Sequence, residues 1–188
     1  MEEQDKERAT LAGGCFWCLE AVFEQLRGVD QVESGYCGGH AADPSYEQVC
    51  AGVTGHAEAV QVIFDPQAIT FRELLDIFFA IHDPTMLNRQ GPDVGTQYRS
   101  AVFYHSPEQK ATAEESIAEL NTTGIFQEAM VTEVTPLTTF YPAEEYHREY
   151  YRRNPEQSYC QLLITPKLSK LRKQFSEKLK AGATPATT

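Results

Sequence analysis

The chain has 188 residues, a formal net charge of −11 and 41% hydrophobic residues. This length and composition fit one domain with a sizeable core. The acidic net charge argues against a protein that binds nucleic acid through a basic surface. No apolar run approaches the length of a membrane span, and the charged N-terminus lacks an apolar signal segment. We therefore expect a cytoplasmic protein without membrane contact, whose five cysteines are reduced thiols.

The first half of the chain predicts strands that alternate with helices. Hydrophobic periodicity indicates a strand over residues 8–12, a helix over residues 15–26, a strand over residues 29–36 and a short helix from Ser45. Alternation in residues 57–64 predicts a strand with Glu58 on the face of Val60, Val62 and Phe64. If that face packs into the core, the Glu58 carboxyl is desolvated; if the strand ends there, it lies in solvent.

The second half continues this alternation. Thr70 and Glu73 form a capping box ahead of a helix over residues 71–81. Ser106 and Pro107 begin another helix in the same way, between strands expected over residues 100–105 and 130–134. Residues 166–183 carry six basic side chains and one acidic one, with apolar residues at helical spacing. We expect an amphipathic C-terminal helix that docks onto the acidic body of the protein rather than onto a membrane.

Mixed strands and helices indicate an α/β (α+β) fold. We expect a single-domain, ferredoxin-like, two-layer plait, in which helices cover one face of the sheet, followed by a long coil-rich C-terminal segment. One catalytic domain would occupy residues 1–180. The composition of residues 181–188 predicts a disordered tail.

The most informative motif is Gly13-Gly14-Cys15-Phe16-Trp17-Cys18, at the junction of a strand and a helix. A thiol at a helix N-terminus meets free backbone N–H groups and the positive end of the helix dipole, and both favour the thiolate. The two aromatic residues supply apolar walls, and Trp17 is the only tryptophan of the chain. The pattern indicates a reactive cysteine in an aromatic pocket; the alternatives are a buried core cysteine and, for the Cys-x-x-Cys pair, half of a metal site.

Three further clusters contain residues that can take part in catalysis or binding. A glycine-rich loop, residues 35–46, ends in Tyr46, whose hydroxyl is placed to reach into a pocket. Gly-His-Ala-Glu at residues 55–58 supplies Glu58, a candidate general acid if its pKa is raised by burial. A polar, glycine-punctuated loop over residues 89–99 offers the carboxylate of Asp93 and the hydroxyl of Tyr98 as binding groups.

These clusters occur in a recognisable order. The chain closely resembles the A-type peptide methionine sulfoxide reductases over roughly residues 8–175. The matching elements are Gly-Cys-Phe-Trp at 14–17, Gly-Tyr-x-Gly-Gly at 35–39, Pro-x-Tyr at 44–46, Gly-His-Ala-Glu at 55–58, His-Asp-Pro at 82–84, Gly-x-Asp-x-Gly-Thr-x-Tyr-Arg-Ser at 91–100 and Asn-Pro…Tyr-Cys at 154–160.

The resemblance implies a role for each matched residue. It implies that Cys15 is the nucleophile that attacks the sulfoxide sulfur and that Glu58 donates the proton to the sulfoxide oxygen. The remaining implied roles are hydrogen bonds to that oxygen from Tyr46 and Tyr98, a methyl-binding pocket made by Phe16 and Trp17, a contact of Asp93 with the substrate backbone, and an outer pocket lined by His147 and Tyr150. Restriction to the S epimer, in proteins and in the free amino acid, is likewise implied.

The resemblance also implies that Cys15 becomes a sulfenic acid and then a disulfide, which thioredoxin, or dithiothreitol in vitro, reduces; it implies no cofactor and no metal. Many relatives have glycine in place of Cys18 and use a cysteine near the C-terminus. Here both Cys18 and Cys160 are available, and we favour Cys160, in a segment expected to be flexible, as the first resolving thiol. We read Cys50 as a core residue and Cys37 as a substitution without function. We expect a monomer.

Rival interpretations make different use of the same residues. A general Cys-x-x-Cys thiol–disulfide oxidoreductase is the main alternative, but it leaves the aromatic residues, Glu58 and the tyrosines without a purpose. A zinc module lacks a second closely spaced pair of ligands. A cysteine hydrolase needs a histidine beside Cys15, which no motif supplies, and a non-catalytic interaction module requires that Cys15 be unreactive.

Overall fold

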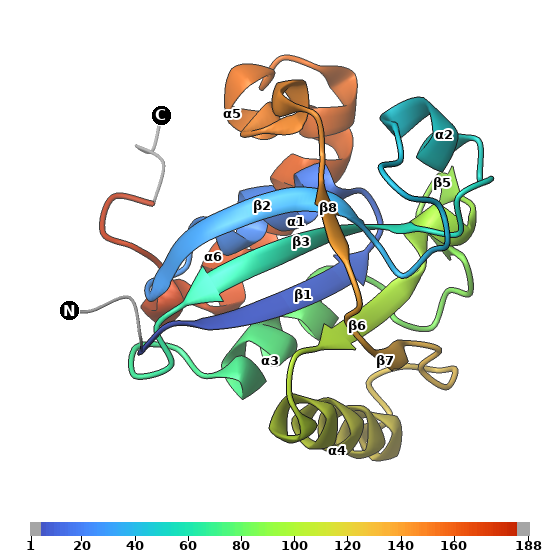
Figure 1. Cartoon of the computed structure of the whole chain (residues 1–188). Helices are drawn as coiled ribbons and strands as arrows, with labels where there is room; N and C mark the ends of the chain where they lie inside the picture. Colours follow the sequence, from blue (N-terminus) through green and yellow to red (C-terminus); the bar gives the residue numbers. More distant parts are fainter. Residues whose placement is uncertain (1–4, 184–188) are drawn as a thin grey trace.

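The computed structural model describes residues 5–183. Its centre is a six-stranded sheet in the order β7-β6-β1-β3-β2-β8, which curls around one layer of helices (Figure 1). The strands are β1 (Glu7–Gly13), β2 (Val29–Cys37), β3 (Ala57–Phe64), β6 (Ser100–Tyr104), β7 (Glu133–Pro136) and β8 (Phe140–Pro142). All neighbouring pairs are antiparallel except β6 and β7, which run parallel. The parallel pair is joined by a helical crossover, as parallel strands require.

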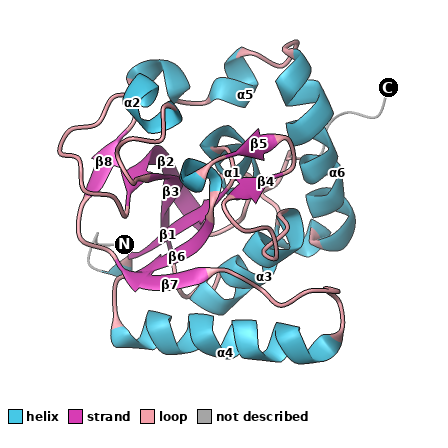
Figure 2. Cartoon of the chain, turned by 90° about the vertical axis from the view of Figure 1, so that its right-hand side faces the viewer, coloured by secondary structure: helices cyan, strands magenta, loops and turns pink. Residues whose placement is uncertain are grey.

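Helices cover one face of the sheet and one of its edges. The main helices are α1 (Phe16–Phe23), α3 (Phe71–Ile81), α4 (Pro107–Thr123) and α6 (Thr165–Gln174). α1, α3 and α6 lie behind the sheet in Figure 1, whereas α4 runs along the edge formed by β6 and β7 (Figure 2). The shorter elements are α2 (Tyr46–Cys50), α5 (Tyr150–Arg153), the two-stranded ribbon of β4 (Arg89–Gln90) and β5 (Asp93–Val94), and the short helical turns η2 (Thr96–Tyr98), η3 (Glu145–His147), η4 (Cys160–Ile164) and η5 (Ser176–Lys178).

The alternation in β3 decides what each face of the sheet buries. Val60, Val62 and Phe64 enter the main core together with the apolar sides of α1 and α3. Glu58 points to the same side and is buried, as the alternation predicted if that face were in the core. Glu58, the polar residue of this face, is therefore enclosed by the core. Burial of this kind raises the pKa of a carboxyl group.

The other face of the sheet carries small side chains. Ala57 and Ala59 belong to a second buried cluster, which is covered by Leu137, just after β7, and by Phe140, at the start of β8. A Cβ atom on Gly35 would overlap the ring of Phe140, so glycine at this position lets the crossing segment approach the sheet.

Several element boundaries differ from the sequence prediction. The helix predicted over residues 15–26 ends at Phe23, because the chain turns there towards Gly28, which has a φ of +88°. The strand predicted over residues 130–134 is displaced to Glu133–Pro136, where it pairs with β6. The ribbon of β4 and β5 and the edge strand β8 were not predicted, because two or three residues show no periodicity.

The C-terminal part contains more helix than the coil-rich segment that was predicted. A π-helix over Cys160–Ile164 leads directly into α6, which ends at Gln174. The basic segment docks onto the body as predicted: Lys178 pairs with Glu73, and Lys180 donates to the carbonyl of Glu24. Residues 181–183 follow as a turn, while the rest of the predicted disordered tail lies outside the described residues.

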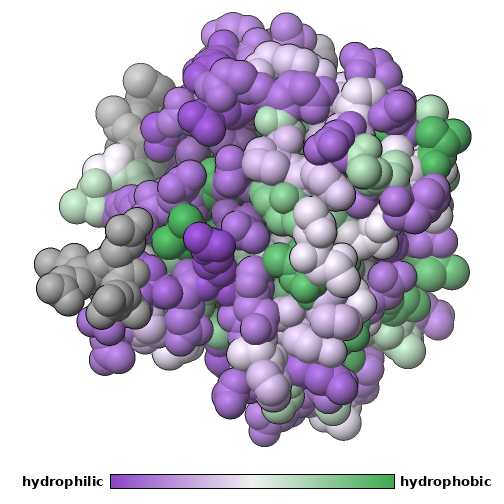
Figure 3. All heavy atoms as spheres, in the orientation of Figure 1, coloured by the Kyte–Doolittle hydropathy of each residue, from purple (hydrophilic) through white to green (hydrophobic). Residues whose placement is uncertain are grey.

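Within residues 5–183, no helix combines the length and the apolar character that a membrane crossing requires. The face shown in Figure 3 has small hydrophobic groups among mostly hydrophilic residues. Large exposed apolar side chains are spread along the chain; they are Val53, Leu87, Val94, Ile125, Tyr146 and Leu162. Single exposed apolar residues of this kind are normal on a protein surface.

Candidate active site

Cys15 lies at the corner where β1 ends and α1 begins. It is the N-cap residue of α1, with extended backbone angles (φ −61°, ψ 128°), and its side chain is buried. Gly14 precedes it with a φ of +94°, and a Cβ there would come within 2.8 Å of the side chain of Gln90. Glycine at 14 therefore makes this sharp corner possible, which places the thiol at the start of the helix.

Cys15 and Cys18 form a hydrogen-bonded thiol pair within the first turn of α1. Burial raises the pKa of Cys15 well above its usual value, and the bond with Cys18 and the nearby Glu58 carboxyl raise it further. The bond from Cys15 lowers the pKa of Cys18 to about 7, against the effect of burial. Desolvation therefore opposes the effect of the helix N-terminus on Cys15, and the two thiols titrate as a coupled pair.

Glu58 reaches the same corner from β3. Its carboxyl is buried, accepts a hydrogen bond of 3.1 Å from the backbone N–H of Phe16 and is hydrogen-bonded to the Cys15 thiol. Desolvation raises the pKa of Glu58 to about 8, although the bonds from Phe16 and Cys15 oppose this shift. At neutral pH the carboxyl therefore holds a proton next to the thiol, as a general acid must.

The aromatic residues after Cys15 build a box with side chains from distant segments. The rings of Trp17 and Tyr150 stack at 3.7 Å with an interplanar angle of 7°. The indole N–H of Trp17 donates to Nδ1 of His147 at 3.0 Å, and His147 also packs on Phe16 at 4.9 Å between centroids. The ring of Tyr46 closes this wall, 4.4 Å from His147. An apolar S-methyl group fits such a box.

Tyr46 and Tyr98 reach the site from two short helical elements, α2 and η2. Tyr46 is the first residue of α2 and Tyr98 is the last residue of η2. Desolvation is the main cause that raises the pKa of both hydroxyls, and the charge of Glu58 adds to it, so both remain protonated donors. The Cys50 thiol forms hydrogen bonds with both hydroxyls and is exposed, which corrects the prediction that Cys50 is a core residue.

Tyr159 is a site residue that the sequence analysis overlooked. Its hydroxyl donates to Asp93 at 2.5 Å and is hydrogen-bonded to the thiols of Cys15 and Cys18. Its ring also meets the edge of Trp17 at 5.7 Å. The available signal was its place in the Tyr-Cys pair at the end of the last motif. The bond to Asp93 links the loop of residues 89–99 to the C-terminal segment.

Cys160 is buried inside the π-helix, in contrast to the flexible segment that was expected. Burial is the main cause that raises the pKa of Cys160, and the charge of Cys18 adds to it, whereas the hydrogen bond of Cys15 goes to Cys18. Cys37 is buried on the far face of the sheet, in the cluster with Ala57 and Ala59. All five cysteines are free. Among residues 5–183, no group of three or more His, Cys, Asp or Glu side chains is arranged to hold a metal ion.

The structure thus combines a buried pair of thiols, a protonated carboxyl and an aromatic box on a curled α/β sheet. This combination defines a cysteine-dependent oxidoreductase. The family model for peptide methionine sulfoxide reductase matches residues 7–179. The chain belongs to this family, in its A type, and is an enzyme that reduces methionine sulfoxide.

Individual relatives agree with this assignment. The peptide methionine sulfoxide reductase MsrA of Deinococcus radiodurans is 57% identical over 175 residues, which cover 93% of this chain and 85% of that protein. The crystal structure of reduced Mxr1 from Saccharomyces cerevisiae is 37% identical with a TM-score of 0.77, covering 85% of this chain and 91% of Mxr1. A structure of Mxr1 in complex with Trx2 is 25% identical with a TM-score of 0.55, covering 79% and 87%.

Proposed function

We propose that Cys15 is the nucleophile of methionine sulfoxide reduction and that Glu58 is the acid. The observation that carries this proposal is the buried Glu58 carboxyl, which a hydrogen bond of 3.1 Å from the backbone N–H of Phe16 holds next to Cys15 and whose pKa is raised to about 8. The oxygen of the substrate moves to the Cys15 sulfur, so that methionine sulfoxide is reduced to methionine and the thiol is oxidised to a sulfenic acid. The substrate is the S epimer, free or within oxidised proteins.

The sulfoxide oxygen is the group that needs stabilisation as its bond to sulfur breaks. Glu58 supplies the proton, and the hydroxyls of Tyr46 and Tyr98 supply directed hydrogen bonds as negative charge develops. Both tyrosines are half-buried, and partial exclusion of water strengthens these bonds because the local dielectric is lower than that of water. Phe16 and Trp17 hold the methyl group of the substrate.

The outer part of the site would bind the rest of the substrate. Asp93 already accepts a bond from Tyr159, and the spare lone pairs of its carboxylate can accept a substrate backbone N–H. His147 and Tyr150 extend the aromatic wall beyond Trp17. These residues would orient a peptide without taking part in the oxygen transfer.

Cys18 is the better placed of the two candidate resolving thiols. Cys18 is hydrogen-bonded to Cys15 and has the lower pKa, so it can attack the sulfenic acid, forming a disulfide and releasing water. Cys160 then attacks the Cys18 sulfur, which breaks the Cys15–Cys18 bond, forms a Cys18–Cys160 disulfide and regenerates the Cys15 thiol. Direct attack by Cys160 on the sulfenic acid of Cys15 is the competing route.

Thioredoxin would return the final disulfide to two thiols. The complex of Mxr1 with Trx2 supports this choice of reductant, and dithiothreitol would replace it in vitro. No cofactor or metal takes part in this sequence of steps. Because every step depends on free thiols, a cytoplasmic location fits it best.

The order β6-β1-β3-β2, with α1 and α3 as crossovers, supports assignment of the central sheet to the ferredoxin-like plait. The strands β7 and β8 then extend the plait at its two edges. One catalytic domain over residues 1–180, acting as a monomer, completes the proposal.

A single turnover without external reductant tests the proposal. The reduced protein is mixed with a peptide that contains both epimers of methionine sulfoxide, and the products are separated by chiral chromatography. We expect loss of the S epimer alone and a new disulfide that contains Cys18. Unchanged peptide with a free Cys15 thiol would refute the assigned roles.

A further inference from the structure

His147 carries a buried nitrogen whose hydrogen bond is unaccounted for. Its side chain is completely buried, and its Nδ1 accepts the indole N–H of Trp17 at 3.0 Å. Burial lowers the pKa of His147, so the ring is neutral. Since Nδ1 is an acceptor in a neutral ring, the proton is on Nε2. Within residues 5–183, Nε2 has no hydrogen-bond partner.

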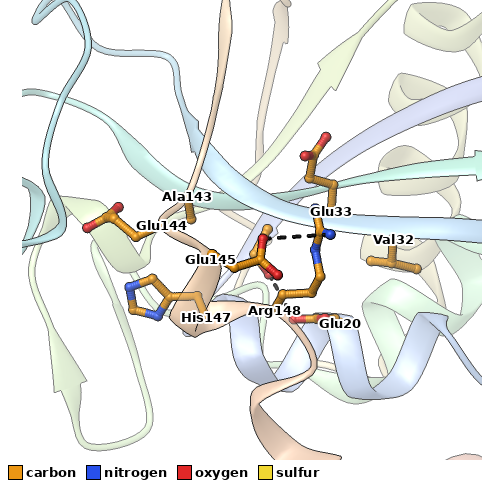
Figure 4. A pocket seen from close by; sticks show the side chains of 9 residues that line it. Glu20, Val32, Glu33, Ala143, Glu144, Glu145, His147 and Arg148 are labelled. Atoms are coloured by element: carbon orange, nitrogen blue, oxygen red, sulfur yellow. Dashed lines mark hydrogen bonds and ion pairs between the residues drawn. The ribbon is translucent and has the colours of Figure 1, made fainter.

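A small cavity of about 20 Å³ has His147 in its lining (Figure 4). Its lining includes His147, Ser34, Glu20 and Glu144. A water molecule needs about 10–15 Å³ of such volume and two or more polar partners. The cavity therefore has both the size and the polar lining that one ordered water requires.

Glu144 is the acceptor that best suits this water. Its charge acts on His147, whereas burial raises the pKa of Glu20 to about 7, which makes Glu20 the weaker acceptor. Desolvation opposes ionisation of Glu144, but hydrogen bonds from its own N–H, from the N–H of Tyr46 and from the hydroxyl of Tyr36 hold its pKa below the usual value. Glu144 thus stays a carboxylate with lone pairs to spare.

We infer that a buried water bridges Nε2–H of His147 to the Glu144 carboxylate, which makes Glu144 a positioning residue for two walls of the active site. Directly, Glu144 accepts the backbone N–H of Tyr46 at 3.0 Å, at the start of α2, where no helical partner exists. Through the water, Glu144 fixes the His147 tautomer that is protonated at Nε2 and whose Nδ1 accepts the hydrogen bond from the Trp17 indole. The catalytic consequence rests on the proposed roles of Tyr46 and Trp17.

This arrangement explains how a carboxylate outside the pocket shapes its interior. Tyr46 begins α2 and Trp17 lies in α1, so the two walls come from different elements of the chain. Glu144, which follows β8, supports the Tyr46 wall by a direct hydrogen bond and the Trp17 wall through the water and His147. A small displacement of either wall misplaces the substrate, and a shift of about 1 Å can cost about 100-fold in rate.

Nuclear magnetic resonance of the ¹⁵N-labelled reduced protein tests the bridge without any activity measurement. We expect the His147 ring to be protonated at Nε2, with a slowly exchanging proton that shows a cross-peak to bound water. Glu144→Ala should abolish the slow exchange and shift the fluorescence of Trp17, the only tryptophan. Glu145→Ala, which removes an exposed carboxyl at the same cavity, is the matched control and should change neither signal.

Activity then tests the positioning role. Glu144→Ala should lower the single-turnover kcat/KM by about 10- to 100-fold, and Glu144→Gln, which keeps an acceptor for Tyr46, should restore part of the loss. If Glu144→Ala fails to fold, faster exchange of the His147 proton in Glu144→Gln supports the bridge. A proton on Nδ1, or loss of slow exchange in Glu20→Gln but not in the Glu144 variants, would overturn it. Tyr46→Phe with full activity would refute the proposed function of Tyr46 and leave the water bridge intact.

Discussion

The backbone N–H of Phe16 donates a hydrogen bond of 3.1 Å to the carboxyl of Glu58. Phe16 is the first residue of α1, where N–H groups lack partners inside the helix. A side chain from β3 thus accepts a hydrogen bond from a free N–H group of the helix that begins next to Cys15. The bond holds the proposed acid and the proposed nucleophile at a fixed separation before any substrate arrives, which is the preorganisation that catalysis needs.

Glu58→Gln should slow the reductive step by about 10²- to 10⁴-fold, the usual contribution of a general acid. The amide keeps the bond from Phe16 but has no proton to give. In the parent enzyme the single-turnover rate should fall as pH rises through about 8, where the pKa of Glu58 lies. The variant should lack this decline. Stopped-flow single turnovers across pH measure both, and an unchanged profile in the variant would exclude Glu58 as the acid.

Glu58→Gln, which should lower the reaction rate, should raise the free energy of unfolding. The folded-state pKa of Glu58 is raised to about 8 from an ordinary value of 4.5. Between these values the unfolded chain has lost the proton that the folded protein keeps, so Glu58 lowers the free energy of unfolding as pH rises.

Glu58→Gln removes this penalty. Its stability relative to the parent should increase by up to about 4 kcal/mol between pH 5 and pH 8. Urea unfolding at the two pH values provides the measurement. Glu47→Gln, at an exposed carboxyl of α2, is the matched control. An equal difference between Glu58→Gln and the parent at both pH values would contradict the raised pKa.

The two resolving thiols can be separated by paired variants. Cys160→Ser should still form a Cys15–Cys18 disulfide after one turnover, because these sulfurs are hydrogen-bonded. Cys18→Ser should accumulate the sulfenic acid of Cys15, which a dimedone adduct detects by mass spectrometry. Rapid formation of a Cys15–Cys160 disulfide in Cys18→Ser would instead assign the first resolving step to Cys160.

Tyr159→Phe should make Cys15 harder to ionise. The Tyr159 hydroxyl lowers the pKa of Cys15 against the larger effect of burial, because its one proton can be donated to the thiolate in place of Asp93. Without it, the alkylation of Cys15 by iodoacetamide should shift to higher pH, as followed by peptide mass spectrometry. Tyr151→Phe, whose hydroxyl pairs with Thr165 at 3.0 Å, is the control. Identical alkylation profiles for the two variants would show that the Tyr159 hydroxyl has no influence on the thiol.

Local patterns in the sequence predicted much of the fold. The capping box of Thr70 and Glu73 begins α3, and the side chain of Ser106 caps α4 as its position before Pro107 indicated. The alternation in β3 correctly placed Glu58 with the core residues. These features depend on residues within a few positions of each other, so the sequence displays them directly. The ribbon of β4 and β5 depends on pairing between two-residue strands and gave no such signal.

By itself, the sequence determined the corner at Gly14 and Cys15, the thiol pair one helical turn apart and the face of β3 that bears Glu58. Only the tertiary structure decided how these groups ionise, because burial raises the pKa of Cys15 while its bond lowers that of Cys18. It also decided the contacts of His147, Tyr150 and Tyr159, which lie more than 120 residues from Trp17 along the chain. Desolvation and long-range contacts are properties of the packed chain, and no local pattern of residues encodes them.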